Sequence, residues 1–304
     1  MLKLDGVSKT YRVGAFGRRS MTAVRDVDLE LRPGEVVSLI GESGSGKSTI
    51  GRLILRLIVP TSGEITFGGS DVAALRGGDL KEYYRHVQGV FQDPFSSYNP
   101  VFRAERVLHM IRPAYFPGVS DADWQVKVEE SLSAVSLNPG DVLGKYAHQL
   151  SGGQLQRMLI ARALLLDVRL LVADEVISML DASTRIDVLN LLADLKERGL
   201  AVLFITHDLS LGNYLSDRTV ILRRGSVVER GATGKVFGDP QHPYTRMLLS
   251  SVPRLGQRWS ELPAESYAGE CRYHQRFPDG GPGLAQVDDD HFVACFKLHE
   301  GRTV

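Results

Sequence analysis

The sequence predicts an α/β fold in which a parallel sheet is flanked by helices. Strands and helices alternate from residue 169 onward, through "RLLVAD", the helix "TRIDVLNLLADLKERG", the strand "AVLFIT" and a helix from Asp208. Nearer the N-terminus, the apolar strand "EVVSLI" leads through a glycine-rich turn into a helix that begins at Lys47. Strand–helix alternation of this kind is typical of a parallel sheet covered by helices.

The remaining segments add strands at the N-terminus and helices in the middle of the chain. "LKLDGVSKTYRV", "AVRDVDLELRPGEVVSLIG" and "GEITFGG" show the short alternation, broken by Gly and Pro, that indicates strands joined by turns. The spacing of apolar residues predicts a helix over 47–59 that ends at Pro60, and mostly helices over 99–166. "TVILRRGSVVERG" indicates a hairpin, and after "GDPQHPYT" the composition shifts toward Pro, Gly and polar residues.

Composition excludes several classes of protein. Lys plus Arg equals Asp plus Glu at 36 each, so the net charge gives no reason to expect a nucleic-acid partner. Charged residues interrupt the longest apolar stretches well short of the roughly 20 residues that a spanning helix needs. The first residues, "MLKLDGVSKTYRV", contain no apolar core of signal-peptide length, and two cysteines exclude a disulfide-rich secreted scaffold. We therefore expect a cytoplasmic chain, with any membrane span supplied by other subunits.

"GESGSGKST", Gly41–Thr49, is a phosphate-binding loop in its proper context between a strand and a helix. Its glycines let successive backbone N–H groups point at phosphate oxygens, and the helix that follows adds its positive end. Lys47 is expected to reach the β and γ phosphates, and the Ser48 hydroxyl to ligate Mg²⁺. The loop predicts a site for a nucleoside triphosphate formed by Gly41, Glu42, Ser43, Gly44, Ser45, Gly46, Lys47, Ser48 and Thr49.

Two carboxylates end the strand "RLLVADE". An enzyme with this loop needs an acidic residue at a strand end to hold Mg²⁺, and Asp174 fills that position. Glu175 follows immediately and is placed to orient or deprotonate the attacking water. A carboxylate pair at a strand end is otherwise as often a solvated turn, and here the phosphate loop favours catalysis.

"HQLSGGQLQR", residues 148–157, is a second phosphate-binding nest. Ser151, Gly152 and Gly153 supply a hydroxyl and two glycines just before a helix. One nucleotide does not need two such loops from one chain. We therefore expect the second loop to bind the nucleotide held by another subunit.

With these motifs in order, residues 2–235 resemble the ATP-binding-cassette (ABC) ATPase family. The resemblance implies a P-loop NTPase core with an antiparallel β subdomain and a helical subdomain at about 93–166. We place the ABC ATPase domain at 1–238 and a C-terminal extension at 239–304.

The family's functional residues are carried over by motif. Tyr11 resembles the aromatic residue that stacks on adenine, and Gln92 the Q-loop glutamine that contacts Mg²⁺ and water. Asp181 resembles the D-loop aspartate at the dimer interface, and His207 the switch histidine that holds the γ-phosphate. The resemblance implies catalysis by Glu175, His207 and Gln92, metal binding by Ser48, Gln92 and Asp174, and a signature loop at Ser151, Gly152, Gly153 and Gln154.

One motif departs from the family. Many relatives read "DEPTSALD" where this chain reads "DEVISMLD", so that Val176 and Ile177 replace Pro and Thr. Asp174, Glu175 and Asp181 are retained. We interpret the change as a packing variation that leaves catalysis intact.

"GDPQHPYTRMLLSSVP" and "GVFQDPFSSYNP" resemble ATPases of the oligopeptide/dipeptide permease family. That family imports short peptides, and some members import nickel or oligosaccharides; "DEVISMLD" tilts the expectation slightly toward oligosaccharides. The resemblance implies a second ABC ATPase subunit (a different chain or a second copy), two transmembrane permease subunits and an external binding protein, with no nucleic acid. It implies a peripheral protein on the cytoplasmic face of the cell membrane. An ABC ATPase acting outside transport, DNA-associated or regulatory, is the alternative.

Both cysteines lie in the last segment. Many members of the peptide-permease family carry four cysteines there, and some hold an iron–sulfur cluster, whereas this chain has only Cys271 and Cys295. Two thiolates fall short of the four such a cluster uses, so we expect none. A Zn²⁺ site made by Cys271, His274, His291 and Cys295 is an open alternative to packed thiols.

Overall fold

The computed structural model describes residues 1–13, 19–251 and 283–295. The chain divides into two compact units. One unit comprises Met1–Leu31, Glu35–Ala73 and Phe204–Val304, and the other comprises Arg32–Gly34 and Ala74–Leu203. We call them the nucleotide-loop unit and the helical unit, and each is described by itself.

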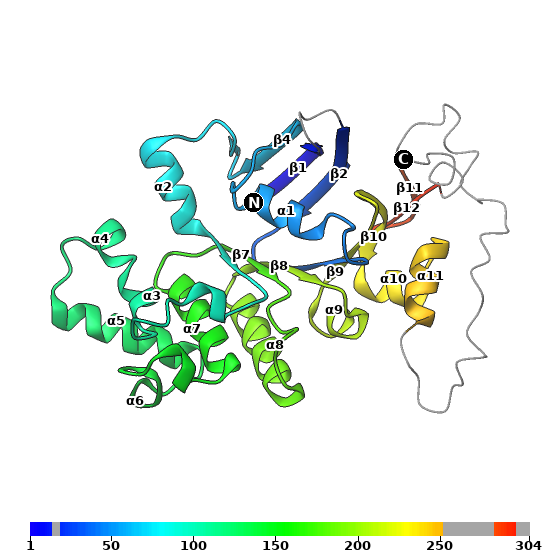
Figure 1. Ribbon diagram of the computed structural model, residues 1–304. Helices are drawn as coiled ribbons and strands as arrows, with labels where there is room; N and C mark the ends of the chain where they lie inside the picture. Colours follow the sequence, from blue (N-terminus) through cyan, green and yellow to red (C-terminus); the bar gives the residue numbers. More distant parts are fainter. Residues whose placement is uncertain (14–18, 252–282, 296–304) are drawn as a thin grey trace. The chain divides into compact units, whose positions relative to one another are not determined.

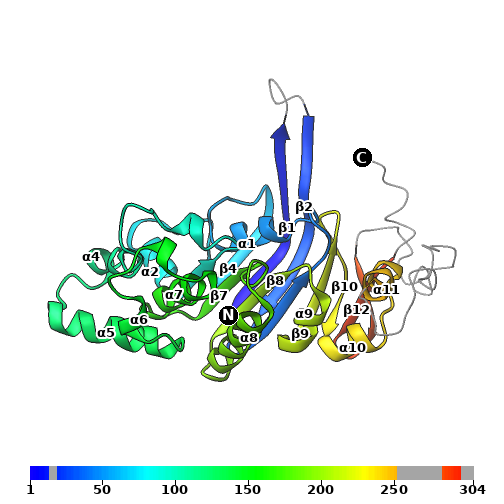
Figure 2. The same ribbon diagram turned by 60° about the horizontal axis from the view of Figure 1, so that its bottom comes forward.

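An antiparallel sheet opens the nucleotide-loop unit (Figure 1). It contains β1 (Leu2–Val13), β2 (Arg19–Leu31), β4 (Ser62–Phe67) and β5 (Ser70–Asp71), in the order β2-β1-β4-β5. Alternate residues of β1 and β2 are buried because successive side chains of a strand point to opposite faces. The antiparallel β subdomain expected from the sequence is confirmed, and β1 and β2 form its long hairpin (Figure 2).

A second sheet carries the phosphate loop. Its strand β3 (Val36–Ile40) is buried at every residue and pairs in parallel with β9 (Arg218–Arg223). The hairpin partner β10 (Ser226–Ala232) follows, and β12 (His291–Ala294) and β11 (Leu284–Asp288) extend the sheet from β10. The C-terminal segment therefore adds strands to the sheet that contains β3. The boundary at residue 239 stays a prediction.

Among the described residues of this unit, α9 (Leu209–Leu215), α10 (Thr233–Gly238) and α11 (Pro243–Ser250) pack against this sheet, and α1 (Lys47–Ile54) follows the phosphate loop. Their core joins Ile40 and Ile221 of the sheet to Val236 of α10 and Tyr244 of α11. Figure 1 shows α10 and α11 side by side near β10. The C-terminal helix is thus part of the hydrophobic core beneath the phosphate-loop strand.

The first helix is shorter than the sequence predicts. The prediction of a helix over 47–59 was wrong beyond Ile54, because Arg56 adopts the left-handed conformation at φ 51° and ends the helix. The N–H of Leu57 then donates to the carbonyl of Arg52 at 2.9 Å, a bond that closes helix C-termini. Leu57 and Val59, which continued the apolar pattern, are more than half exposed.

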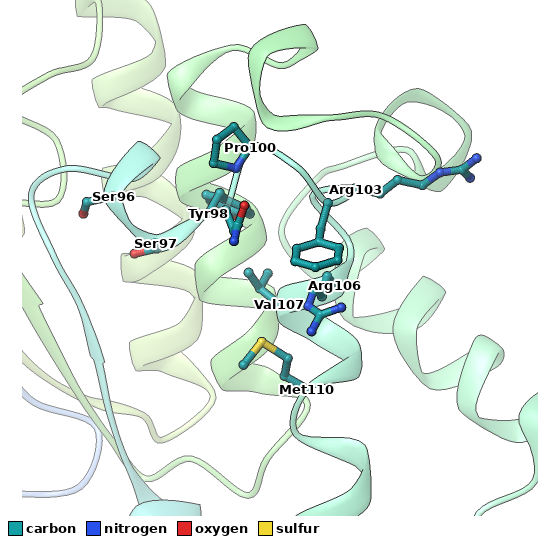
Figure 3. A pocket seen from close by; sticks show the side chains of 10 residues that line it. Ser96, Ser97, Tyr98, Pro100, Arg103, Arg106, Val107 and Met110 are labelled. Carbon is teal, nitrogen blue, oxygen red and sulfur yellow. The ribbon is translucent and has the colours of Figure 1, made fainter.

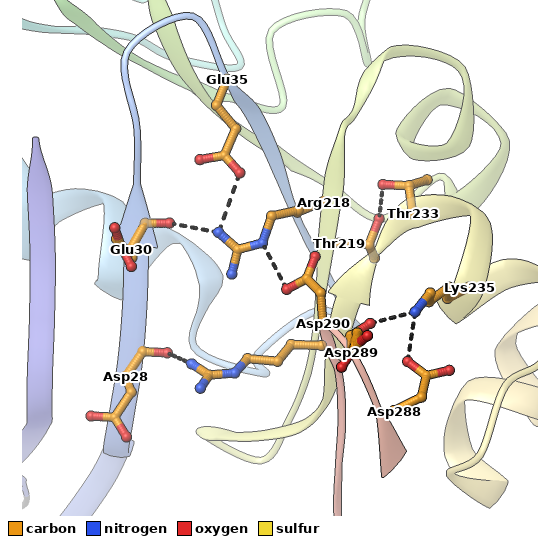
Figure 4. A network of polar contacts seen from close by, with 11 residues as sticks. Asp28, Glu30, Glu35, Arg218, Thr219, Thr233, Lys235, Asp288, Asp289 and Asp290 are labelled. Atoms are coloured by element: carbon orange, nitrogen blue, oxygen red, sulfur yellow. Dashed lines mark hydrogen bonds and ion pairs between the residues drawn. The ribbon is translucent and has the colours of Figure 1, made fainter. Parts of the chain in front are cut away.

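Two arginines, one in β9 and one in β10, link segments of this unit (Figure 4). Nη1 of Arg218 in β9 lies 3.2 Å from Oε1 of Glu35. Nε of the same arginine lies 3.6 Å from Oδ1 of Asp290, a residue in the turn between β11 and β12. Arg230 of β10 donates to the carbonyl of Asp28 in β2 at 2.9 Å. Partly buried arginines that bridge several acceptors in this way hold neighbouring strands in register.

The helical unit contains the middle of the chain and confirms the expected run of helices over 99–166. Trp124, which is 2% exposed, donates through Nε1 to Nδ1 of His109 at 2.8 Å and marks its core. The elements are α2 (Gly77–His86), β6 (Val87–Val90), α3 (Arg106–His109), α4 (Arg112–Tyr115), α5 (Asp121–Ala134), α6 (Pro139–Val142), α7 (Gly152–Leu164), β7 (Leu170–Asp174) and α8 (Ala182–Glu197).

Strand β8 (Ala201–Thr206) is buried throughout, and the division between the two units falls within it. Within the described ranges, no helix combines the length and the apolar character needed to cross a membrane.

Candidate functional site

The phosphate loop lies between β3 and α1 in the nucleotide-loop unit. Two of its glycines are required by close packing. A Cβ atom on Gly41 would stand 2.1 Å from the carbonyl oxygen of Leu222, and one on Gly46 would stand 2.4 Å from that of Ala23. Gly46 also has φ 106°, a conformation that favours glycine, and it forms the N-cap of α1. The turn is therefore fixed by the backbone of its neighbours.

Lys47 is only 5% exposed, and its ammonium group is held by the loop itself. The Nζ atom donates to the carbonyl of Gly41 at 2.7 Å and to that of Glu42 at 2.8 Å. A buried cation held on loop carbonyls, beside the first N–H groups of α1, fits an anionic ligand. The Oγ atom of Ser45 is buried with no hydrogen-bond partner among the described residues, which also suits a loop built to receive a polar group.

The same unit contains two further predicted site residues. Tyr11 lies in β1 opposite Met21, with Nζ of Lys9 5.3 Å from the centre of its ring. His207 is exposed and follows the last residue of β8. Asp208, the next residue, caps α9 by accepting from the N–H of Ser210 at 2.9 Å.

The helical unit brings Gln92 and the two acidic residues to one edge. Strands β6 and β7 are parallel, with Val90 paired to Ala173, so the residues that follow leave from the same end of the pair. Gln92 follows β6 by two residues and is exposed, while Asp174 is the last residue of β7 and is 8% exposed. An amide and two carboxylates thus follow the same ends of two paired strands.

Glu175 has an unusual backbone for a non-glycine residue. Its φ is 51°, in the left-handed region, which costs of order 1–3 kcal/mol. Ser178 stabilises the turn, because both its N–H and its hydroxyl donate to the carbonyl of Glu175, at 3.1 and 2.9 Å. The side chain is partly exposed beside the buried Asp174. Strain of this kind is tolerated where the position of a side chain matters.

Val176 and Ile177, the two residues that depart from the family motif, are each 2% exposed. Buried aliphatic side chains at these positions contribute packing of the turn after β7.

The signature loop caps a helix. Ser151 is the N-cap of α7, and its Oγ accepts from the N–H of Gln154 at 3.2 Å, while Oε1 of Gln154 accepts from the N–H of Ser151 at 2.9 Å. This reciprocal pair is a capping box. Gly153 is small for a separate reason, because a Cβ atom there would stand 2.2 Å from Cγ2 of Thr184 in α8.

Asp181 caps α8 in a similar way. Its carboxylate accepts from the Ser183 hydroxyl at 2.6 Å, and from the N–H and hydroxyl of Thr184 at 3.0 and 2.9 Å. These hydrogen bonds, that from Ser183 foremost, hold the pKa of the Asp181 carboxyl well below its usual range. The residue is therefore a cap that stays ionised.

Hydrogen bonds also tie the segment after β6 to α7. The side chain of Gln156, fully buried, donates to the carbonyl of Phe91 at 3.3 Å, and the Tyr98 hydroxyl donates to the carbonyl of Leu155 at 2.8 Å. Burial raises the pKa of Tyr98. No local pattern in the sequence identifies Gln156, since its role depends on a contact with a residue 65 positions away.

A groove of about 560 Å³ opens beside this segment (Figure 3). Arg106 lies over the ring of Phe102, with its Cζ 3.8 Å from the ring centre. Met110 at 66% and Phe102 at 40% exposure give the groove an apolar border. The lining residues are Ser96, Ser97, Tyr98, Asn99, Pro100, Phe102, Arg103, Arg106, Val107 and Met110.

The C-terminal hairpin bears on the zinc alternative. Nε2 of His291 lies 2.8 Å from Oε1 of Glu229, and both side chains are buried. Cys295 is also buried, at 1% exposure, whereas Cys271 and His274 lie outside the described residues. His291 thus has a carboxylate partner that needs no metal, and the zinc and iron–sulfur expectations stay predictions.

Comparison with family models finds two matches. Residues 24–178 match the model described as ABC transporter, and residues 228–282 match the oligopeptide/dipeptide transporter C-terminal region.

Two groups of named proteins resemble the chain. It is 38% identical to a protein of Brucella ovis named as a peptide import ATP-binding protein, over 98% of each chain. It is 43% identical to the glutathione import ATP-binding protein of Salmonella paratyphi A, over 80% of this chain and 39% of that protein.

Among solved structures, the chain resembles a dimeric ATP-binding cassette, MJ0796, in a post-hydrolysis state with ADP and phosphate. The two share 32% identity and a TM-score of 0.69, over 77% of this chain and 99% of the other. The α/β P-loop fold expected from the sequence is confirmed by this likeness.

Proposed function

The chain belongs to the ABC transporter family and is one of its ATPases, and on that premise we propose that it powers an importer for short peptides. The observation that carries the proposal is the match along nearly the whole chain, C-terminal region included, to a protein named for peptide import. The similar proteins of Brucella and Salmonella are named for peptide and for glutathione import, so we favour peptides over the oligosaccharides that "DEVISMLD" suggested.

ATP is the substrate that the loop residues suit. We assign its phosphates to the backbone of Gly41–Thr49 and to Lys47, and its adenine to Tyr11. Mg²⁺ would be held by Ser48, Gln92 and Asp174. When bound, it would neutralise part of the negative charge on the phosphates. The exposed Gln92 and the buried Asp174 leave from one edge of the β6–β7 pair, and this supports assigning them a shared role.

Glu175 is the residue that we assign to the attacking water. A carboxylate at the end of a strand, held in a left-handed turn by Ser178, is suited to orient water or accept its proton. His207 is assigned to the γ-phosphate, as a donor that stabilises charge during transfer.

A second ABC ATPase subunit completes the site in this proposal. Ser151, Gly152, Gly153 and Gln154 of one subunit bind the nucleotide held by the other, and the partner is a different chain or a second copy of this one. The resemblance to a cassette solved as a dimer supports this arrangement.

Two transmembrane permease subunits are the proposed partners of the helical unit. The groove lined by Phe102 and Met110 offers them an apolar surface beside the segment that bears Gln92. The chain is then a peripheral protein on the cytoplasmic face of the membrane, and an external binding protein delivers the peptide.

The test is ATP hydrolysis by the chain assembled with its permease subunits in vesicles. We expect turnover to rise when the external binding protein is added with peptide, and to stay at the basal rate with oligosaccharide. Stimulation by oligosaccharide and not by peptide would contradict the proposal and identify oligosaccharides as the imported substrates. Stimulation by DNA without permease subunits, or ATP binding with no turnover at all, would favour the alternative of an ABC ATPase that acts outside transport.

A further inference from the structure

The C-terminal helix α11 makes direct contact with the phosphate loop. The hydroxyl oxygen of Tyr244 accepts a hydrogen bond from the N–H of Glu42 at 3.1 Å. The two residues are 202 positions apart, and Tyr244 is 1% exposed. Within the loop, Glu42 is the second residue, next to the glycine that packs against Leu222.

One peptide group links this tyrosine to the buried lysine. The peptide that joins Gly41 and Glu42 presents its carbonyl to Nζ of Lys47 at 2.7 Å and its N–H to Tyr244. A peptide group is planar, so a bond at the N–H fixes the direction of the carbonyl. Donor and acceptor bonds on one amide also polarise each other in a buried setting. The orientation of the Gly41–Glu42 peptide therefore depends on Tyr244.

Tyr244 is itself held from two sides. The guanidinium carbon of Arg223 in β9 lies 5.0 Å from the centre of its ring. Its own N–H donates to Nδ1 of His242, the N-cap of α11, at 3.0 Å. The N–H of His242 in turn donates to Oε2 of the buried Glu229 at 2.9 Å. The hydroxyl is thus presented to the loop by a rigid support.

We propose that Tyr244 is a positioning residue for the phosphate loop, through which the C-terminal region sets the affinity of the site for nucleotide. A loop that is already ordered loses less conformational entropy when phosphate binds. Without the hydroxyl, the Gly41–Glu42 peptide rotates more freely in the empty loop, and Lys47 loses a fixed acceptor. This inference rests on the proposed function, in that the loop must bind nucleotide.

The test compares two tyrosine variants of the full chain by calorimetric titration with MgADP. We expect Tyr244→Phe to weaken binding by about three- to tenfold, the worth of one hydrogen bond. Tyr115→Phe is the control, since it also removes one hydrogen bond from a tyrosine hydroxyl to a backbone carbonyl, that of Lys81 in α2 at 3.3 Å. This variant should bind MgADP within about twofold of the parent chain, because the lost hydrogen bond does not involve the phosphate loop and affects only the stability of the fold.

Amide hydrogen exchange of the loop provides a second readout. We expect the N–H of Glu42 and its neighbours to exchange faster in Tyr244→Phe and not in Tyr115→Phe, with both variants folded as judged by thermal melting. Equal MgADP affinity and equal loop exchange in Tyr244→Phe and the parent chain would overturn the inference and leave the proposed function intact. A parent chain that binds neither MgADP nor MgATP would instead overturn the proposed function.

Discussion

Gly153 in α7 and Thr184 in α8 approach each other so closely that a Cβ atom at position 153 would force the threonine side chain to move. A Cβ atom there would stand 2.2 Å from Cγ2 of Thr184, and the methyl group belongs to the first turn of α8. The adjacent Gly152 has no such neighbour, because a Cβ atom there would make an ordinary contact of 3.6 Å with Leu180. Close packing therefore accounts for the glycine at position 153 and not for the one at position 152.

Gly153→Ala should destabilise the protein by about 1–3 kcal/mol, the usual cost of forcing a methyl group into a packed contact. Thermal unfolding of the purified variant measures the effect. Gly152→Ala, which meets only an ordinary contact, is the matched control and should change stability little.

The double variant Gly153→Ala, Thr184→Ser identifies the cause. Serine keeps the hydroxyl that donates to Asp181 but lacks Cγ2, so most of the lost stability should return. Failure of the serine to restore stability would show that the close contact with the methyl group is not what excludes alanine.

The N-cap at Asp181 predicts a pH dependence of stability. The folded pKa lies below the ordinary value of 3.8, so near and below that value the unfolded chain binds more protons than the folded one. The contribution is present above the unfolded pKa and is lost as the pH falls through the folded pKa. In denaturant titrations, Asp181→Asn should therefore lose less stability than the parent between about pH 5 and pH 3. Parallel curves for the two proteins would contradict this assignment.

Local patterns made the nucleotide loop and the strand ends predictable. "GESGSGKST" and "RLLVADE" each contain, within nine residues, all the residues that predict their function. The structure has the first after β3 and the second at the end of β7, as expected. The end of α1 was not predicted, because the apolar spacing continues past Ile54 while the left-handed conformation of Arg56 ends the helix. The bonds from Gln156 to Phe91 and from Glu42 to Tyr244 were also missed, since each joins residues far apart in the sequence.

Glu229 should prove important for the C-terminal hairpin and α11 together. Its carboxylate accepts from the backbone N–H groups of Gln241 and His242, and Oε1 also faces His291. Glu229→Gln places an amide donor against one of these donors, in a fully buried position. We expect a loss of about 2–4 kcal/mol in thermal unfolding. Glu130→Gln, an exposed position in α5, is the control and should have no measurable effect.

The groove beside α3 predicts a variant that separates transport from nucleotide binding. Met110→Glu places a charge on its apolar border, where Met110 is 66% exposed, and should abolish association with permease subunits in pull-down from membranes. Binding of MgATP to the isolated chain should be unchanged. Val126→Glu, at a 53% exposed residue of α5 outside the groove, should associate normally. Loss of association by both variants, or by neither, would argue against the groove.

Glu175→Gln tests the assignment of the water-activating residue. Glutamine has the same shape as glutamate and can occupy the same left-handed turn, since the Ser178 hydroxyl and N–H donate to the backbone carbonyl of residue 175, which the substitution keeps. It cannot accept a proton, so turnover should fall by about 10²–10⁴-fold while MgATP still binds. The variant should then accumulate as a closed dimer on size-exclusion chromatography with ATP. Glu197→Gln, an exposed carboxylate at the end of α8, is the control for loss of charge and should hydrolyse ATP normally. Normal turnover in Glu175→Gln would exclude Glu175 from that role and transfer it to another group near the end of β7.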